Sequence, residues 1–229
     1  MNMTPLSGSN KIVVVGGGAA GMMAAGMAAQ AGAQVTLLEQ NGRLGKKLLI
    51  TGKGRCSVTN ACPWQEVLQS VPTNPRFLYS ALAGFSPADA KKFFEDYGCA
   101  LKTERGNRVF PVSDRSQSVL DALERFLRAY HVRILPRKAA EIAVSDGRVT
   151  GVKTAEGPVP ADCVVLATGG LSYPATGSTG SGYAMAQAIG HTIIEPTGSL
   201  VPLVEKGHDC AKMQGLALKN IAVKLVNTK

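Results

Sequence analysis

A glycine pattern near the N-terminus carries the clearest chemical signal in the sequence. Gly16, Gly18 and Gly21 form a G-x-G-x-x-G pattern directly after the β-branched run Lys11–Val15. The first glycine allows a tight turn, the second lets the backbone approach a pyrophosphate, and the third lets the following helix pack close to the strand. The N-terminus of that helix, expected over Ala19–Ala31, offers free N–H groups and a positive dipole to phosphates.

An acidic residue stands where a dinucleotide site needs one. The helix leads into a second strand, Gln34–Glu39, so this part of the chain forms a β–α–β unit. Glu39 at the end of that strand can accept hydrogen bonds from a ribose, and its charge would repel an additional 2′-phosphate. A glycine-rich turn that serves only close packing would not account for this acid. The set therefore predicts dinucleotide binding.

A later strand that ends in Ala167-Thr168-Gly169 gives a second signal. It follows a β-meander that the alternating pattern predicts over Glu141–Leu166. In this position the turn resembles the second fingerprint of two-dinucleotide-binding flavoproteins, in which the strand returns beside the first one. The resemblance implies that the glycine loop holds FAD rather than NAD.

Longer motifs resemble one flavoprotein family. The whole set is similar, over essentially the full chain, to the BaiN/RdsA-type flavoproteins, which include aminoacetone-oxidase-like and YhiN-like proteins. The motifs are G-R-L-G-K-K-L-L-I-T-G-K-G-R-C-S-V-T-N at Gly42–Asn60, F-P-V-S at Phe110–Ser113, G-G-L-S-Y-P-A-T-G-S-T-G at Gly169–Gly180, Gly190-His191, and S-L-V-P-L at Ser199–Leu203.

The resemblance implies a cytoplasmic FAD-dependent oxidoreductase. It would transfer hydride between NAD(P)H or a small organic substrate and the flavin. Reduction of a conjugated enone and oxidation of an amine are both implied. The alternative is a non-catalytic nucleotide- or RNA-associated flavin-binding module, which only the basic charge of the chain favours.

The resemblance also implies which residues hold the cofactor, although it assigns no catalytic residue. Ser57 and Ser181 stand where the family pattern has Asn and Asp, which leaves the contacts at these two positions open. The residues that we expect to bind FAD are Gly16, Gly18, Ala19, Ala20, Gly21, Glu39, Gln40, Lys46, Lys47, Gly54, Arg55, Cys56, Ala140, Ala167, Thr168 and Gly169.

Three cations and a cysteine in the hallmark loop could take part in flavin chemistry. Lys46, Lys47 and Arg55 would bring positive charge next to the pyrophosphate, and such charge near a flavin favours its anionic reduced form. The alternative for these side chains is a solvated loop. Cys56 is either a redox residue or a small packed residue near the cofactor, and Cys62 has poor spacing for a dithiol partner.

The composition excludes several classes of protein. The chain has 229 residues, 45% of them hydrophobic, 18% charged and 26 of them glycine, which excludes disorder, collagen and a coiled coil. Its net charge of +9 comes without a run of five like charges, so we expect a small-molecule substrate and no nucleic acid. Five cysteines without a C-x-x-C pair indicate neither a disulfide framework nor a metal site. The uncharged stretch Ile12–Leu38 is broken by glycines, so we expect no membrane span.

These observations predict an α/β fold, a Rossmann-like FAD-binding domain of the two-dinucleotide-binding type. We expect it over residues 1–203, with the start of an inserted substrate domain over 204–229. The family normally returns to the first domain with a C-terminal acidic loop, so the chain is expected to be incomplete, with weak FAD retention. The expected parallel strands are Lys11–Val15, Gln34–Glu39, Val132–Leu135 and Cys163–Ala167; helices are Ala19–Ala31, Ser86–Tyr97, Ser116–Tyr130 and Ser181–Gly190; and a last strand covers residues 221–225.

Overall fold

The computed structural model describes residues 10–198, 204–216, 221, 222, 224 and 226. The chain divides into two compact units, Met1–Ile193 and Ile194–Lys229. The second unit contains the short helix α7 (Asp209–Lys212). The predicted strand over 221–225 includes Val223 and Leu225, which lie outside the described residues, and the predicted domain boundary after residue 203 stays a prediction.

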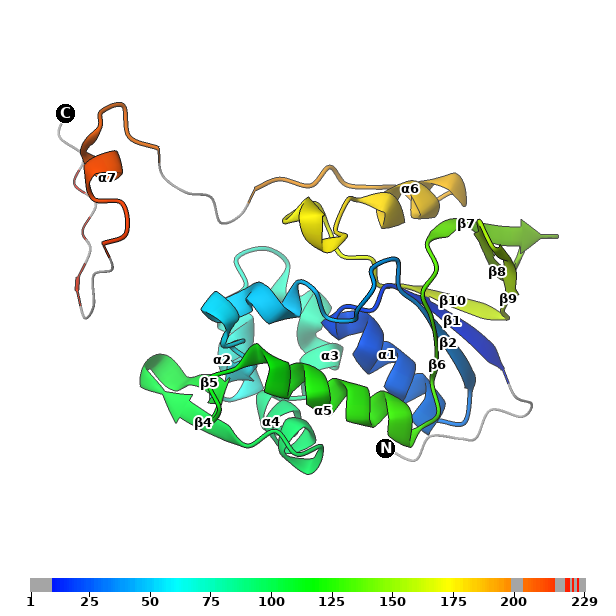
Figure 1. The fold of residues 1–229 in the computed structure, drawn as a ribbon, viewed down its shortest axis with the longest axis horizontal. Coiled ribbons are helices and arrows are strands. Elements are labelled where there is room, and N and C mark those ends of the chain that lie inside the picture. The colour runs from blue at the N-terminus through cyan, green and yellow to red at the C-terminus, as the bar shows by residue number, and fades with distance from the viewer. Residues whose placement is uncertain (1–9, 199–203, 217–220, 223, 225, 227–229) are drawn as a thin grey trace. The chain divides into compact units, whose positions relative to one another are not determined.

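A four-stranded parallel sheet forms the centre of the first unit (Figure 1). Its strands are β1 (Lys11–Val15), β2 (Gln34–Leu38), β6 (Arg133–Leu135) and β10 (Cys163–Leu166), in the order β10-β1-β2-β6. All pairs are parallel, which confirms the predicted sheet. Because the strands run in one direction, all their carboxyl ends meet at one edge.

Two helices cover one face of this sheet. They are α1 (Ala19–Gln30) and α5 (Ser116–Ala129), both close to their predicted bounds. Val14 and Leu37 point to this face and are fully buried with side chains of both helices. One side of α5 packs on the sheet because its apolar residues recur at helical spacing, while its other side stays polar.

An antiparallel sheet covers the opposite face. It consists of β7 (Ala139–Ser145), β8 (Arg148–Thr154) and β9 (Gly157–Pro160) and confirms the predicted meander. Val13, Val15 and Leu38 share a core with residues of this sheet and with Met185 of helix α6 (Ser181–Ala188).

The last strand of the parallel sheet differs from its prediction. Cys163 is exposed and the rest of β10 is only half-buried, whereas the sequence predicts a strand buried on both faces. The reason is its position at the edge of the sheet, where no strand of the described residues pairs with its outer side. A continuous apolar run shows that a strand belongs to a sheet, but it does not show whether the strand is central.

A long connection between β2 and β6 builds a further layer beside α5 (Figure 1). The sequence predicts only one of its helices before α5, and the capping box of Ser86 and Asp89 confirms that start. The short elements, and those inside the expected loop over residues 41–60, are not predicted. The elements are η1 (Leu48–Gly54), β3 (Thr59–Asn60), α2 (Trp64–Gln69), η2 (Pro75–Leu78), α3 (Tyr79–Gly84), α4 (Pro87–Asp96), β4 (Leu101–Glu104), η3 (Arg105–Asn107) and β5 (Arg108–Pro111).

The packing of α1 against α5 yields a stability test at Gly26. A Cβ atom there would lie 2.1 Å from Cε1 of Phe126, whose ring is buried among other aromatic rings and cannot swing away. Replacing Gly26 by Ala improves helix propensity by about 1 kcal/mol, but overpacking costs about 1–3 kcal/mol. We therefore expect a net loss of stability in urea unfolding. The control is Gly84→Ala, because no described atom lies within 4 Å of that Cβ position; equal stability of both variants would contradict the packing argument.

Candidate functional site

A pocket of about 470 Å³ lies at the carboxyl ends of the parallel strands. Four of the segments that line it follow β1, β2, β6 and β10 directly, and others come from the connection after β2 and the loop before α6. Ligands of open parallel sheets bind at this edge, where neighbouring connections diverge. The main segments lining the pocket are residues 15–20, 38–41, 46–48, 56–58, 137–139, 167–169 and 176–178.

Two glycines of the loop allow close packing, and a third lies at the pocket. A Cβ atom at Gly16, whose φ is +108°, would lie 2.4 Å from the carbonyl oxygen of Ala167. One at Gly21 would lie 1.8 Å from the carbonyl oxygen of Gly16, so both positions need glycine for close packing. At Gly18 no atom of the described residues lies within 4 Å of the Cβ position, and this residue lines the pocket.

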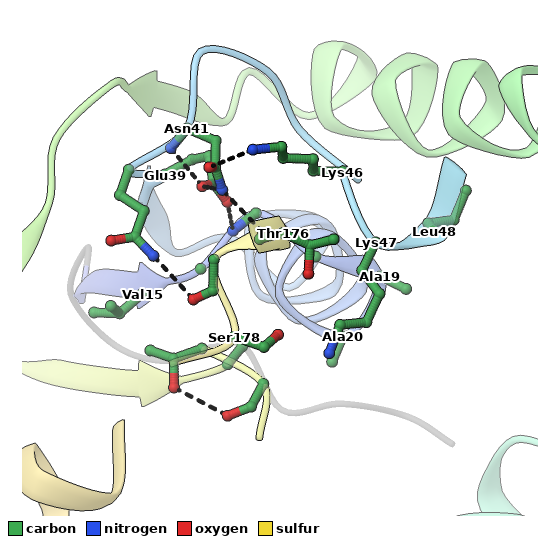
Figure 2. Close-up of a pocket in the computed structure, with 18 of the residues that line it drawn as sticks. Val15, Ala19, Ala20, Glu39, Asn41, Lys46, Lys47, Leu48, Thr176 and Ser178 are labelled. Atoms are coloured by element: carbon green, nitrogen blue, oxygen red, sulfur yellow. Dashed lines mark hydrogen bonds between the residues drawn. The ribbon is translucent and has the colours of Figure 1, made fainter. Parts of the chain in front are cut away.

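The N-terminus of α1 is open toward the pocket. Gly18 is its N-cap, and among the described residues no side chain caps it and no acid lies in its first turn. The first helical hydrogen bond runs from the Met22 N–H to the Gly18 carbonyl oxygen at 2.9 Å. Ala19 and Ala20 line the pocket, as Figure 2 shows. A helix end with free N–H groups in an open cavity fits a diphosphate.

Glu39 is buried and holds three N–H donors. Its Oε2 accepts from the Gly17 N–H at 2.7 Å, and its Oε1 accepts from both the backbone N–H and the side-chain amide of Asn41, each at 2.7 Å (Figure 2). The Gly17 carbonyl oxygen accepts from the Gly45 N–H at 2.9 Å, so both sides of this residue are bound. A Cβ at Gly17 would lie 2.4 Å from Leu44 Cδ2 and 2.9 Å from Glu39 Oε2, so a side chain at this position, which the motif leaves free, would displace Leu44 or Glu39.

The opposite wall of the pocket is the loop that follows β10. Gln40 Nε2 donates to the Gly177 carbonyl oxygen at 3.0 Å, and Lys47 Nζ donates to the Ser172 carbonyl oxygen at 2.7 Å. Lys46 Nζ lies 3.5 Å from Asn41 Oδ1. Both lysines line the pocket, and Lys47 already has a partner inside the protein.

One protein-family model matches almost the whole chain. It matches residues 10–229 and is described as the HI0933-like protein Rossmann domain. The chain belongs to the HI0933-like family. This confirms the resemblance that the long motifs indicate, and it confirms the α/β class with a Rossmann-type sheet.

Named relatives of this HI0933-like chain match most of its length. The 3-dehydro-bile acid delta(4,6)-reductase of Clostridium scindens is 37% identical over 209 residues, 90% of this chain and 50% of that protein. The ribosomal RNA dihydrouridine synthase of Escherichia coli is 30% identical over 190 residues, 83% of this chain and 47% of that protein. The chain therefore spans about half the length of these curated relatives.

Solved structures share the fold of the HI0933-like chain. A flavocytochrome c3 fumarate reductase covers 80% of this chain with a TM-score of 0.56 and 23% identity, over 41% of its own length. A 3-ketosteroid-delta4-(5alpha)-dehydrogenase from Rhodococcus jostii covers 79% with a TM-score of 0.59 and 18% identity, over 54% of its own length.

Most residues that the sequence assigns to FAD meet in the pocket of this HI0933-like domain, whereas four do not line it. Gly21 packs below the loop, and Gly54 and Arg55 lie outside the pocket lining. Ala140 is exposed and lines a neighbouring cavity, while Ala139 is buried and lines the pocket. Successive strand residues face opposite sides, so an error of one position reverses the assignment.

Arg55 binds carboxylates of its own protein. Its guanidinium pairs with Glu104 and Asp114 and lies over the Phe110 ring, 4.1 Å from the ring centre. Lys102 Nζ joins the cluster at 2.7 Å from Asp114. The hydrogen bond from Arg55 lowers the pKa of Glu104, and those from Lys102 and Arg55 lower the pKa of Asp114. The structure thus gives Arg55 a different role from the phosphate contact that the motif suggests.

Cys56 is a packed residue in the pocket wall. It is buried, has a φ of +57°, and lines the pocket beside Ser57. Burial raises the pKa of the Cys56 thiol, and its hydrogen bond with Thr51 offsets this only in part. A raised pKa keeps the thiol protonated at neutral pH, which favours the packed residue over a reactive thiolate.

In the described residues, no group of three or more His, Cys, Asp or Glu side chains could hold a metal ion.

Sequence reasoning overlooks several residues of the site. Asn41, Arg137 and Lys138 line the pocket without belonging to a recognised motif, and Thr176 lines it from within the motif at Gly169–Gly180 without having been assigned to FAD. A usable signal exists for the first three, because each follows the predicted end of a parallel strand.

In the described part of the chain, no helix has the length and apolar character needed to cross a membrane.

The charge cluster around Arg55 yields a pH test with Glu104→Gln. The pKa of Glu104 is lowered in the folded protein, so its stabilising effect is present above the unfolded carboxyl pKa of about 4.3 and is lost as the pH falls through the lower folded value. We expect the variant to melt below the wild type at pH 7, and the difference to shrink as the pH falls from 7 to 3. Thermal denaturation of both at the two pH values measures this. Glu156→Gln, at an exposed turn, is the matched control, and a pH-independent difference for Glu104→Gln would refute the ion-pair explanation.

Proposed function

We propose that this chain is the FAD-binding domain of an oxidoreductase that reduces a carbon–carbon double bond conjugated to a carbonyl group. The observation that carries the cofactor is the open N-terminus of α1 facing a pocket whose next strand end presents Glu39. Free N–H groups suit the diphosphate, and the carboxylate suits ribose hydroxyls. When bound, FAD supplies the hydride chemistry.

The reaction class is supported by the names of two relatives. One is named as a reductase of a 3-dehydro-bile acid at delta(4,6), and the other as a synthase of dihydrouridine in ribosomal RNA. Both names describe the saturation of a double bond conjugated to a carbonyl group. We propose a small-molecule enone as substrate and NAD(P)H as electron donor. The five free cysteines support a reducing compartment, the cytoplasm.

A second candidate is an RNA-associated flavoprotein, in which RNA is substrate or binding partner. The net charge of +9 and the dihydrouridine synthase relatives favour it. The two candidates are separated by assaying the longest polypeptide that contains this chain, with FAD and NAD(P)H and without air, against a 3-oxo-Δ4-steroid and against unmodified ribosomal RNA. Bleaching of the flavin by NAD(P)H and reoxidation by the steroid support the enone reductase. Reoxidation by RNA alone supports the second candidate, and no reduction by either nicotinamide contradicts the reductase.

FAD binding by the chain itself is tested at Glu39. Titration of FAD, followed by the change in its fluorescence, should show binding by the wild type. Glu39→Ala should weaken it about tenfold or more, because hydrogen bonds to a charged group are worth about 1.5–3 kcal/mol. Glu141→Ala, which removes an exposed carboxylate paired with Lys153 in the meander, is the control and should bind as the wild type does. If Glu39→Ala binds FAD as tightly as the wild type, the ribose assignment is wrong.

A further inference from the structure

The side-chain amide of Asn41 joins two walls of the pocket. Its Nδ2 donates to Glu39 Oε1 at 2.7 Å and to the Thr176 carbonyl oxygen at 3.2 Å (Figure 2). Glu39 ends β2, whereas Thr176 belongs to the loop after β10, 135 residues further along the chain than Asn41. Both partners line the pocket. One half-buried side chain thus fixes the two walls relative to each other.

Only a side chain with two N–H groups satisfies this arrangement. Both partners of Nδ2 are pure acceptors, a carboxylate and a carbonyl oxygen, so the amide nitrogen must face them. The amide oxygen then faces the Lys46 ammonium, 3.5 Å away. An aspartate of the same shape would place a second carboxylate against Glu39, and an alanine would leave both acceptors without this donor.

The two walls also lie close together at Gly177, the residue that follows Thr176 in the loop. A Cβ atom at Gly177, whose φ is +100°, would lie 2.7 Å from Asn41 Nδ2 and 3.0 Å from Gln40 Nε2. The side chain of Gln40 donates to the Gly177 carbonyl oxygen and, among the described residues, not to Glu39, so it links the loop without holding the carboxylate. The two neighbours, Gln40 and Asn41, therefore separate two effects: holding the loop, and orienting the acid.

We propose that Asn41 is a positioning residue that orients Glu39 for the ribose of the bound dinucleotide. This assignment rests on the proposed FAD site. A carboxylate offers about four acceptor positions, and the two N–H groups of Asn41 and that of Gly17 occupy three of them. These three bonds fix the orientation of the carboxylate, and so the direction of the one acceptor position that is left for a ribose hydroxyl. The same amide keeps the Thr176 segment beside the acid, so that acid and loop act as one binding surface.

The test compares Asn41→Asp and Asn41→Ala by FAD titration at pH 8 and pH 5.5. At pH 8 both carboxylates of the Asp variant are charged and repel each other, so its affinity should fall about tenfold or more. Two adjacent carboxylates raise the pKa of one of them, so on acidification they share a proton and a donor returns. At pH 5.5 the Asp variant should recover only part of its affinity, because one O–H replaces one of the two N–H donors and the Lys46 ammonium, 3.5 Å from Asn41 Oδ1, favours the charged carboxylate. The Ala variant should be weaker at both pH values.

Controls separate this role from a general loss of structure. Asn74→Asp makes the same change at an exposed position outside the pocket and should bind as the wild type does. Gln40→Ala should show a smaller loss without pH dependence. ADP, which carries the ribose and diphosphate but no flavin, should lose affinity for the Asn41 variants by the same factor as FAD. Circular dichroism identifies a variant that fails to fold, and the Ala variant then decides the question.

Each outcome has a separate meaning. Wild-type affinity of both Asn41 variants overturns the positioning role, and so does a loss by Asn41→Asp that is equal at both pH values. A loss that affects FAD but not ADP also overturns it, because the effect would then come from the flavin side. Failure of the longest polypeptide that contains this chain to bind FAD or ADP overturns the proposed function itself, and the assignment of Asn41 with it.

Discussion

The hydrogen bonds of Gly17 are the constraint on which the site depends. Its N–H donates to Glu39 and its carbonyl oxygen accepts from Gly45, so the loop after β1 is bonded at one residue to two points of the connection that follows β2. Leu44 and Glu39 leave no space for a side chain there. This contact fixes the glycine loop, and with it the open end of α1, relative to the carboxylate at the end of β2.

The topology of the sheet explains why such a contact forms at all. Because β1, β2 and β10 are parallel neighbours, their carboxyl ends place the glycine loop, the acid and the Ala167-Thr168-Gly169 turn at one edge. The two layers that cover the sheet bury its faces and leave this edge as the open surface. The pocket follows from strand direction and from the length of the connections, before any particular side chain is considered.

The sequence predicts those parts of the fold and site that local chemistry determines. The glycine loop, Glu39 and the capped helix at Ser86 are each defined within a few neighbouring residues. Arg55 is different, because its partners Glu104 and Asp114 lie about 50 residues away and the motif gives no sign of them. Asn41 likewise depends on Thr176, and the choice of Ala139 over Ala140 depends on the register of β7, which shifts between Ala139 and Glu141. Short helices such as α3 lack a complete apolar period and leave too weak a pattern.

Some basic side chains near the site are already paired within the protein, and this bears on how the domain could bind an anionic ligand. Arg55 is held by two carboxylates, and Lys47 donates to the Ser172 carbonyl oxygen. The charge of Arg55 is thus neutralised within the protein, and the ammonium of Lys47 serves to hold the loop after β10. Lys46, Arg137 and Lys138 also line the pocket, but the glycine loop itself offers the backbone, with the positive end of the α1 dipole and its free N–H groups. These donors are fixed by the helix and lose no side-chain freedom on binding, whereas a lysine would have to be ordered. Under the proposed function, main-chain geometry would contribute the fixed donors to a diphosphate, which accounts for the strong signal of the glycine positions in the sequence.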